Sequence, residues 1–264
     1  IYLGVDVMPN GNIVAVGEKD FSPGYADAIA TIFSSDGDVI ANKTFVIDEN
    51  SSGFFHVVAD KNNNIFISGT RQGTTYMDHQ ILKLDSVLNI IWSKSADMSY
   101  MGINSQALVD IALTENYLYL LNVTGGGYSY YNPVIIGLLK VNPETGNMES
   151  GEVVYHGSSA SNAQNHGAFF IVDDNNKYVI TTPSPERADL YVPNYGFNSN
   201  VVNKAYISYN DSTILLNITG AQTITTMDKV EGKTVFVGIG KDDPEQLGHY
   251  DILVIMTEED LPTA

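Results

Sequence analysis

The feature that most constrains the fold is a unit of about 50 residues that recurs five times along the chain. Each unit has an apolar strand, a tight polar turn, a second apolar strand, a loop, and a third strand that opens at Asp or Asn. In the first unit, the turn at Asn10-Gly11 separates strands at residues 4–7 and 13–17, and it accommodates the positive φ angles of a tight hairpin. The five third strands open at Asp27, Asp78, Asn132, Asn203 and Asp251.

A further turn leads to a fourth strand, at residues 39–46, 90–93 and 148–155 in the first three units. Four antiparallel strands in a unit of this length are typical of a β-propeller blade. Since no segment keeps a helical period over about ten residues, the chain is predicted to be all-β. We predict a single β-propeller domain over residues 1–264, whose last blade lacks a fourth strand and which is either a closed ring or part of a larger one. A β-sandwich is the alternative fold. The units cover approximately residues 1–48, 52–98, 105–157, 166–220 and 221–264.

Charge and composition exclude several classes of function. The chain has 13 Lys and Arg against 31 Asp and Glu, and this net charge of −18 would repel a nucleic-acid backbone. No apolar stretch is long enough for a transmembrane helix. Because Cys is absent, thiol catalysis, disulfides and Cys-based zinc sites are excluded. The chain begins at Ile1 without a leader, so we expect either an exported protein whose signal has been removed or an excised fragment.

Several motifs resemble a short-repeat β-propeller family of secreted and surface-exposed bacterial proteins, notably of the Bacteroidetes. In the first unit the resemblance rests on residues 8–17, Asp27-Ala28 and residues 35–38. In the second unit it rests on Gly69, Asp78, Asp85, Asn89 and Trp92-Ser93-Lys94. Units three and four fit loosely, because they have Asn122 and Thr182 in place of the recurring Gly. The resemblance implies an extracellular or cell-surface, mostly non-catalytic module, and it assigns no catalytic residue.

The chain has 16 Tyr, and several of them fall in the loops between second and third strands. An exposed Tyr ring can stack on the apolar face of a sugar, while nearby Asn and Asp bind its hydroxyl groups. The two longest of these loops are the best candidates for a binding face, because function concentrates in long loops. The alternative is that these rings pack between neighbouring units. The candidate binding residues in these loops are Tyr128, Tyr130, Tyr131, Tyr191, Tyr195 and Phe197.

Two histidines flank the link between the third and fourth units, at residues 157–165. Tyr155, His156 and His166 are therefore added to the candidate binding residues. A His and Tyr pair could serve acid–base chemistry in a polysaccharide lyase or hydrolase, or could bind a metal with a carboxylate. The alternative is that these are polar loop histidines with no shared site.

The Asp and Asn residues that open the third strands have two readings. They could form a ring of cation ligands, or they could cap the turn entering each strand, and their recurrence in every unit favours capping. Acidic turns such as Asp36-Gly37-Asp38 could hold Ca²⁺, but no EF-hand spacing supports this, so we predict no cofactor.

The function predicted from these features is non-catalytic recognition of a glycan, a peptide or a secreted or surface protein, on the face that carries the Tyr-rich loops. A polysaccharide lyase or glycosidase on the same face is one alternative. A structural domain of a larger adhesin is the other.

Overall fold

The computed structural model describes the backbone of most of the chain and the side chains of part of it. The backbone is described for residues 1–22, 25–45, 52–72, 77–96, 106–124, 135–156, 169–172, 178–181, 204–209, 212–217, 221–230, 233–240 and 251–256. Side chains are described within residues 1–19, 27–45, 52–69, 79–95, 110–121 and 138–151 and at Val235. The chain forms two compact units, of which the first comprises Ile1–Thr124 and Leu138–Glu152 and the second comprises Gly125–Gly137 and Val153–Ala264.

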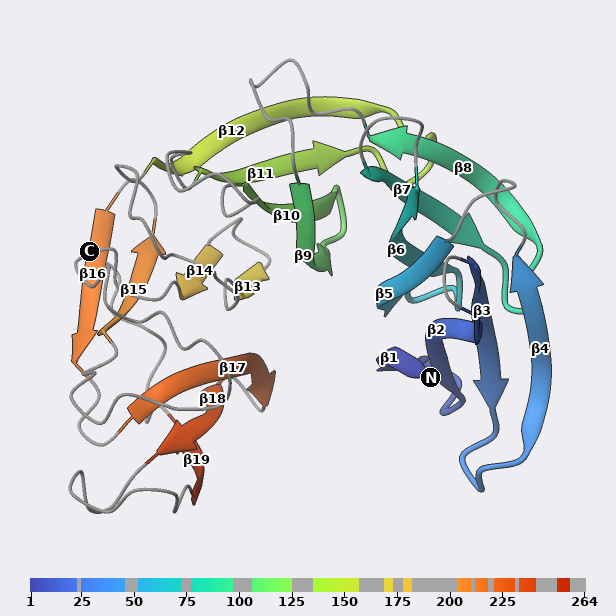
Figure 1. Ribbon diagram of the computed structural model, residues 1–264, viewed down its shortest axis with the longest axis horizontal. Helices are drawn as coiled ribbons and strands as arrows, with labels where there is room; N and C mark the ends of the chain where they lie inside the picture. The colour runs from blue at the N-terminus through green and yellow to red at the C-terminus, as the bar shows by residue number, and fades with distance from the viewer. Residues whose placement is uncertain are drawn as a thin grey trace. The chain divides into compact units, whose positions relative to one another are not determined.

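Three sheets of four strands follow one another along the chain, and in each sheet the strands are hydrogen-bonded in sequence order (Figure 1). The first sheet contains β1 (Tyr2–Val7), β2 (Ile13–Ser22), β3 (Tyr25–Phe33) and β4 (Val39–Phe45). The second contains β5 (Ser52–Ala59), β6 (Ile65–Gln72), β7 (Met77–Leu84) and β8 (Ile90–Ala96). The third contains β9 (Gln106–Leu113), β10 (Leu118–Thr124), β11 (Ile135–Val141) and β12 (Met148–His156).

The later strands form smaller described sheets. β13 (Phe169–Val172) pairs with β14 (Tyr178–Thr181), and β15 (Lys204–Tyr209) pairs with β16 (Ser212–Asn217). A three-stranded sheet contains β17 (Ala221–Val230), β18 (Lys233–Gly240) and β19 (Asp251–Met256). The prediction of an all-β chain built on four-stranded antiparallel sheets is confirmed.

The hairpin turns follow the predicted chemistry. Gly11 has a φ angle of 85° and Asn63 has one of 62°, so both supply the left-handed conformation that their turns require. Asp60 stabilises the second of these turns, because its carboxylate accepts hydrogen bonds from the backbone N–H groups of Asn62 and Asn64, both at 2.8 Å. These short polar turns join β1 to β2 and β5 to β6.

A β-bulge recurs at one position of the repeat. The register of the first hairpin slips between Tyr2 and Gly4, and that of the second slips between Phe54 and His56. The same slip occurs in the β9–β10 and β17–β18 pairs. In the first two sheets the backbone comes close to the second strand beside this bulge, so a Cβ on Gly17 or Gly69 would collide with the carbonyl oxygen of Ile1 or Gly53. The third sheet has the same bulge with Asn122 at this position.

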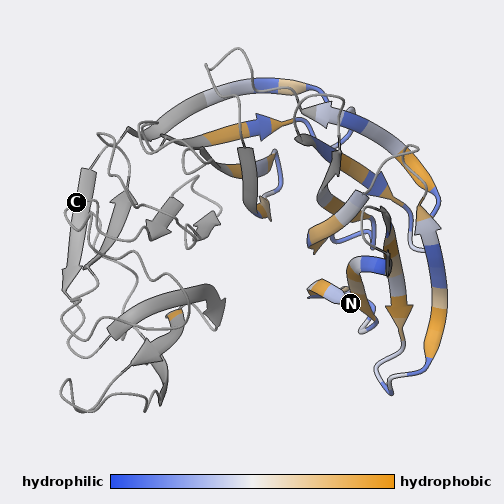
Figure 2. Cartoon of the chain, viewed as in Figure 1, coloured by the Kyte–Doolittle hydropathy of each residue, from blue (hydrophilic) through white to orange (hydrophobic). Residues whose placement is uncertain are grey.

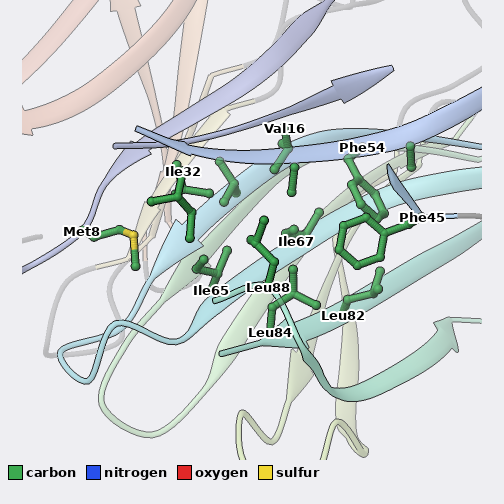
Figure 3. Close-up of a cluster of buried hydrophobic side chains, with 14 residues drawn as sticks. Met8, Val16, Ile32, Phe45, Phe54, Ile65, Ile67, Leu82, Leu84 and Leu88 are labelled. Atoms are coloured by element: carbon green, nitrogen blue, oxygen red, sulfur yellow. The ribbon is translucent and has the colours of Figure 1, made fainter. Parts of the chain in front are cut away.

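Hydrophobic side chains alternate between the two faces of the second sheet. Ile65 and Ile67 of β6 pack against the first sheet, whereas Phe66 between them packs against the third. The contact with the first sheet is a cluster that includes Met8, Val16, Ile32, Phe45, Phe54, Leu82, Leu84 and Leu88 (Figure 3). Hydrophobic and hydrophilic stretches accordingly follow one another along the described strands (Figure 2). The three sheets are therefore stacked face to face in sequence order.

The third strands of the first two units begin earlier than the sequence suggested, whereas β19 begins at Asp251 as predicted. Asp27 lies two residues inside β3, where it is paired with Lys19, and Asp78 is paired with Arg71 inside the β6–β7 ladder. At Asp27, whose side chain is described, Lys19 lies at the directly opposed position, and opposite charges so placed stabilise an antiparallel pair. The capping of a turn by these residues stays a prediction.

Candidate functional site

The most polar contact among the described residues lies between the second and third sheets, and we call it the sheet seam. Lys61 and Glu115 form an exposed ion pair at 3.6 Å. The Nζ atom of Lys83 lies 3.0 Å from Oε1 of Glu144, and the Lys83 side chain is only 3% exposed. The indole Nε1 of Trp92 donates a hydrogen bond to the carbonyl oxygen of Pro143 at 3.1 Å.

A facing pair of titratable side chains lies at one end of this seam. Nδ1 of His56 on β5 is 3.9 Å from Oδ1 of Asp110 on β9, and both side chains are 27% exposed. Each residue directly follows the recurring bulge, so the two occupy the same position in successive units. A bulge turns the side chain beside it out of the regular pleat. The repeat therefore places an imidazole and a carboxylate opposite each other at a solvent-accessible edge.

Ser68 adds a third polar group to this end of the seam. It pairs with His56 across the β5–β6 ladder, and opposed residues of an antiparallel pair lie on the same face. The Ser68 side chain is fully buried, and among the described residues its hydroxyl has no hydrogen-bond partner. Buried hydroxyl groups are usually hydrogen-bonded, so this group is unusual in the core.

The other carboxylate of the first strands has a structural role. Oδ2 of Asp6 accepts a hydrogen bond from the backbone N–H of Ala59 at 2.7 Å, and Oδ1 accepts one from Val7 at 2.8 Å. Asp6 therefore joins the first sheet to the second. The oxygen of Asp110 that faces His56 likewise accepts a hydrogen bond from the backbone N–H of Ile111 at 2.9 Å.

Turn carboxylates form a second class of polar group. Burial of Asp85 opposes its ionisation, but the backbone and side-chain hydrogen bonds from Asn89, the N–H of Val87 and the charge of Lys43 outweigh this effect and lower the pKa of Asp85. These contacts stabilise the β7–β8 turn. Among the residues that the structure describes, no three His, Asp or Glu side chains are grouped to hold a metal ion. No helix in the described part is long and apolar enough to cross a membrane.

The predicted Tyr-rich face falls largely outside the described residues. Tyr155 and His156 are the last two residues of β12, where only the backbone is described. The other seven candidates lie outside the described ranges: Tyr128, Tyr130, Tyr131, His166, Tyr191, Tyr195 and Phe197. That face therefore stays a prediction.

Sequence reasoning missed the pair of His56 and Asp110. It treated His56 as an isolated histidine and did not consider Asp110. A signal was available, because both residues precede the end of the second strand by nearly the same number of positions in successive units. The shorter turn of the third unit moved Asp110 by one position and hid this correspondence.

The comparisons with known proteins bear on the fold. No family model and no curated protein matches the chain. A solved structure described as a thermostable family-43 glycoside hydrolase has a TM-score of 0.53 and 10% identity, over 96% of this chain and 87% of that one. A GH43 β-1,3-galactosidase has a TM-score of 0.50 and 10% identity over 92% of this chain, which spans 54% of that protein. At such low identity the likeness concerns the fold alone, and the chain has a β-propeller-like fold.

Proposed function

We propose that the chain is a carbohydrate-recognition module that binds a glycan without cleaving it. The observation that carries the proposal is the fold likeness to glycoside hydrolases over nearly the whole chain, with TM-scores of 0.53 and 0.50. The chain also has 16 Tyr residues in a strongly acidic sequence. Sugar-binding sites commonly combine aromatic rings with polar side chains.

The proposed binding face is built from the loops between second and third strands. Tyr128, Tyr130 and Tyr131 lie in one such loop, and Tyr191, Tyr195 and Phe197 lie in another. Tyr155, His156 and His166 flank the link between the third and fourth units. A rigid repeat scaffold with unequal loops can supply both affinity and specificity.

We further propose that the five units are blades of one propeller and that the protein works outside the cell or on its surface. Both proposals follow from the repeat and from the composition of the chain. The alternative to a glycan as the binding partner is a secreted or surface protein. Purification of the native protein from the cell envelope and the culture medium tests the location.

A glycan array followed by titration calorimetry tests the proposed function. Saturable binding is expected, and Tyr130→Ala or Tyr195→Ala should weaken it about tenfold, because each removes a ring that stacks on the sugar. Tyr130→Phe is the matched control, since it keeps the ring and should keep most of the affinity. The proposal fails if no glycan binds, or if the alanine variants bind as tightly as the unaltered protein.

Hydrolysis is the second candidate, because both similar structures are described as glycosidases. Incubation with neutral and acidic polysaccharides, followed by assays for reducing ends and unsaturated products, separates binding from cleavage. Product that is lost in His156→Ala or His166→Ala would replace the proposed function with the enzymatic one.

A further inference from the structure

We propose that Lys140, with the rings of Tyr117 and Tyr119 beside it, binds the carboxylate group of an acidic sugar. This inference rests on the proposed carbohydrate-binding function, and it names the class of glycan, one that contains a uronic acid. It is carried by the contacts of Lys140, by its exposure, and by the partner that another lysine has at the same position of the repeat.

Two aromatic rings hold the ammonium group of Lys140 on β11. Its Nζ atom lies over the Tyr117 ring, 5.8 Å from the ring centre, and over the Tyr119 ring, 5.6 Å from the ring centre. The two ring centres are 6.0 Å apart and the ring planes are at 75° to each other. An aromatic ring attracts an ammonium group at such distances but does not neutralise its charge. The rings therefore position a cation that can still bind an anion.

Lys140 occupies the repeat position that Lys83 has in the second sheet. Each lysine is the next-to-last residue of its strand, and Lys83 lies over the Phe66 ring as Lys140 lies over the Tyr119 ring. Lys83 has a carboxylate partner, because Oε1 of Glu144 is 3.0 Å from its Nζ atom. Lys140 forms no hydrogen bond or ion pair with any residue that the structure describes. The position is therefore suited to a carboxylate that the described chain does not supply.

Exposure makes Lys140 accessible to a ligand. Its side chain is half-buried, whereas the Lys83 side chain is only 3% exposed. Tyr117 is also half-buried, so part of its ring can pack against the apolar face of a sugar. Tyr119 is 2% exposed and supports the ammonium group from within the sheet. A cation and an accessible aromatic ring therefore lie together, and a uronic acid offers a partner for each.

The net charge of −18 opposes an anionic ligand mainly at long range. At physiological ionic strength, exposed charges more than about 8 Å apart are largely screened from each other. Opposite charges in contact attract much more strongly than screened like charges repel. Glu115, which is close to Tyr117 in the sequence, is paired with Lys61 at 3.6 Å. A short acidic oligosaccharide can therefore bind to this acidic chain through Lys140.

Titration calorimetry on the full chain tests the inference with trisaccharides of galacturonic acid and glucuronic acid and with their carboxyl-reduced, neutral forms. An acidic trisaccharide should bind about tenfold more tightly than its reduced form, because only the acidic form pairs with the ammonium group. Lys140→Met should abolish this preference, and Lys140→Arg should keep most of it, because it keeps the charge. Lys94→Met is the matched control, since Lys94 is an exposed lysine of β8 and its loss should leave the preference unchanged.

A carboxylate of the chain itself is the competing source. Asp211 lies outside the described residues, in the turn of the fourth unit that corresponds in sequence to the turn of Glu144. A double-mutant cycle of unfolding free energies with Lys140→Met and Asp211→Asn measures the coupling between these positions. If the two substitutions are coupled and the protein has no preference for acidic trisaccharides, the partner belongs to the chain and the inference is overturned.

The outcomes separate this inference from the proposed function. If the glycan array shows binding that depends on Tyr130, but the acidic trisaccharides bind no more tightly than the reduced forms, the inference is overturned and the proposed function stands. A preference that survives in Lys140→Met also overturns the inference. If no trisaccharide binds and the array is empty, both are overturned. Should Lys140→Met fail to fold, a shift of the Tyr117 ring resonances by the acidic form alone supports the inference, and equal shifts by both forms overturn it.

Discussion

At the scale of single residues, Leu88 combines an unfavourable backbone conformation with a buried side chain. Its φ angle is 67°, whereas Gly37 has 91° at the same position of the preceding unit. The left-handed region disfavours residues with a Cβ. The Leu88 side chain is 1% exposed and packs in the cluster between the first two sheets (Figure 3). Burial of this side chain therefore offsets the backbone strain.

Substitution of Leu88 separates these two effects. Leu88→Ala should lower the free energy of unfolding by about 2 to 5 kcal/mol, because it removes the buried side chain and keeps the strain. Leu88→Gly loses the same side chain but relieves the strain, so it should be as stable as Leu88→Ala or more stable by about 1 kcal/mol. Denaturant unfolding measures the order. The same substitutions at exposed Val87 are the control. If Leu88→Gly has a free energy of unfolding well below that of Leu88→Ala, the backbone at this position is not strained.

Asp85 predicts a dependence of stability on pH. Its hydrogen bonds lower its pKa in the folded chain below the ordinary value of 3.8. The ionised carboxylate therefore stabilises the native state above the pKa of the unfolded chain, and this contribution is lost as the pH falls through the lower folded value. Asp85→Asn should be less stable than the unaltered protein at pH 7, and the difference should shrink at low pH. Urea unfolding at several pH values measures it, and a constant difference would rule out this role for Asp85.

Residue-level prediction succeeded where the local chain decides the conformation. The turns at Gly11 and Asn63 follow from residue types that tolerate positive φ. Leu88 could not be predicted in this way, because its conformation depends on burial against the first sheet. A single sequence does not show that distant contact.

At the scale of the elements, the close approach of Gly53 beside the bulge makes Gly69 a position where only glycine fits, although the same bulge has Asn122 at this position in the third sheet. A Cβ there would meet the carbonyl oxygen of Gly53 and would lie 3.0 Å from the ring of Phe54. The backbone carbonyl of Gly53 cannot move aside as the end of a flexible side chain can. Gly69→Ala should therefore lower the free energy of unfolding by about 3 kcal/mol or more, as expected when strain is forced into a packed sheet.

Gly11→Ala is the matched control for this prediction. Gly11 has a positive φ angle, but a Cβ there would meet nothing within 4 Å. Gly11→Ala should lower the free energy of unfolding by about 1 kcal/mol, because only the backbone conformation is unfavourable. Thermal and denaturant unfolding of the two variants measures the difference. Equal losses would mean that the close approach at the bulge does not constrain the chain.

The elements were predictable where the repeat was visible. The strand–turn–strand hairpins of the three four-stranded sheets that the structure describes were predicted from alternating apolar residues and turn residues. The bulge was not predicted, although its sequence trace, the glycine at Gly17 and Gly69, was noticed. Asp27 was predicted to open the third strand, but β3 begins two residues earlier, because Tyr25 pairs with Ser22 of β2.

At the scale of the whole molecule, the fold followed from the repeat, but the candidate site did not. His56 and Asp110 are far apart in sequence and meet only because successive sheets stack with matching positions opposed. The Tyr-rich loops were predicted from residue type and loop length. Residue type and loop length can identify candidate residues, but they do not locate these residues in the fold.

The stacking of the sheets also predicts how the sheet seam responds to substitution. Lys83 occupies the repeat position that Ile32 has in the first sheet, where Ile32 packs in the apolar cluster against the second sheet. The Lys83 ammonium lies 5.2 Å from the centre of the Phe66 ring and depends on Glu144 for its charge partner. Glu144→Gln should therefore lower the free energy of unfolding by about 1 to 3 kcal/mol, because it leaves a buried cation without a counter-charge.

Lys83→Ile converts this position to the arrangement of the preceding sheet and should be neutral or stabilising, because a well-packed apolar residue replaces a buried charge. In that background Glu144→Gln should have almost no effect, since the exposed carboxylate no longer has a buried partner. A double-mutant cycle by denaturant unfolding measures the coupling between the two positions. If Lys83→Ile is strongly destabilising, the seam does not accept the apolar packing that joins the first two sheets, and the units are then less equivalent in their packing than in their strand order.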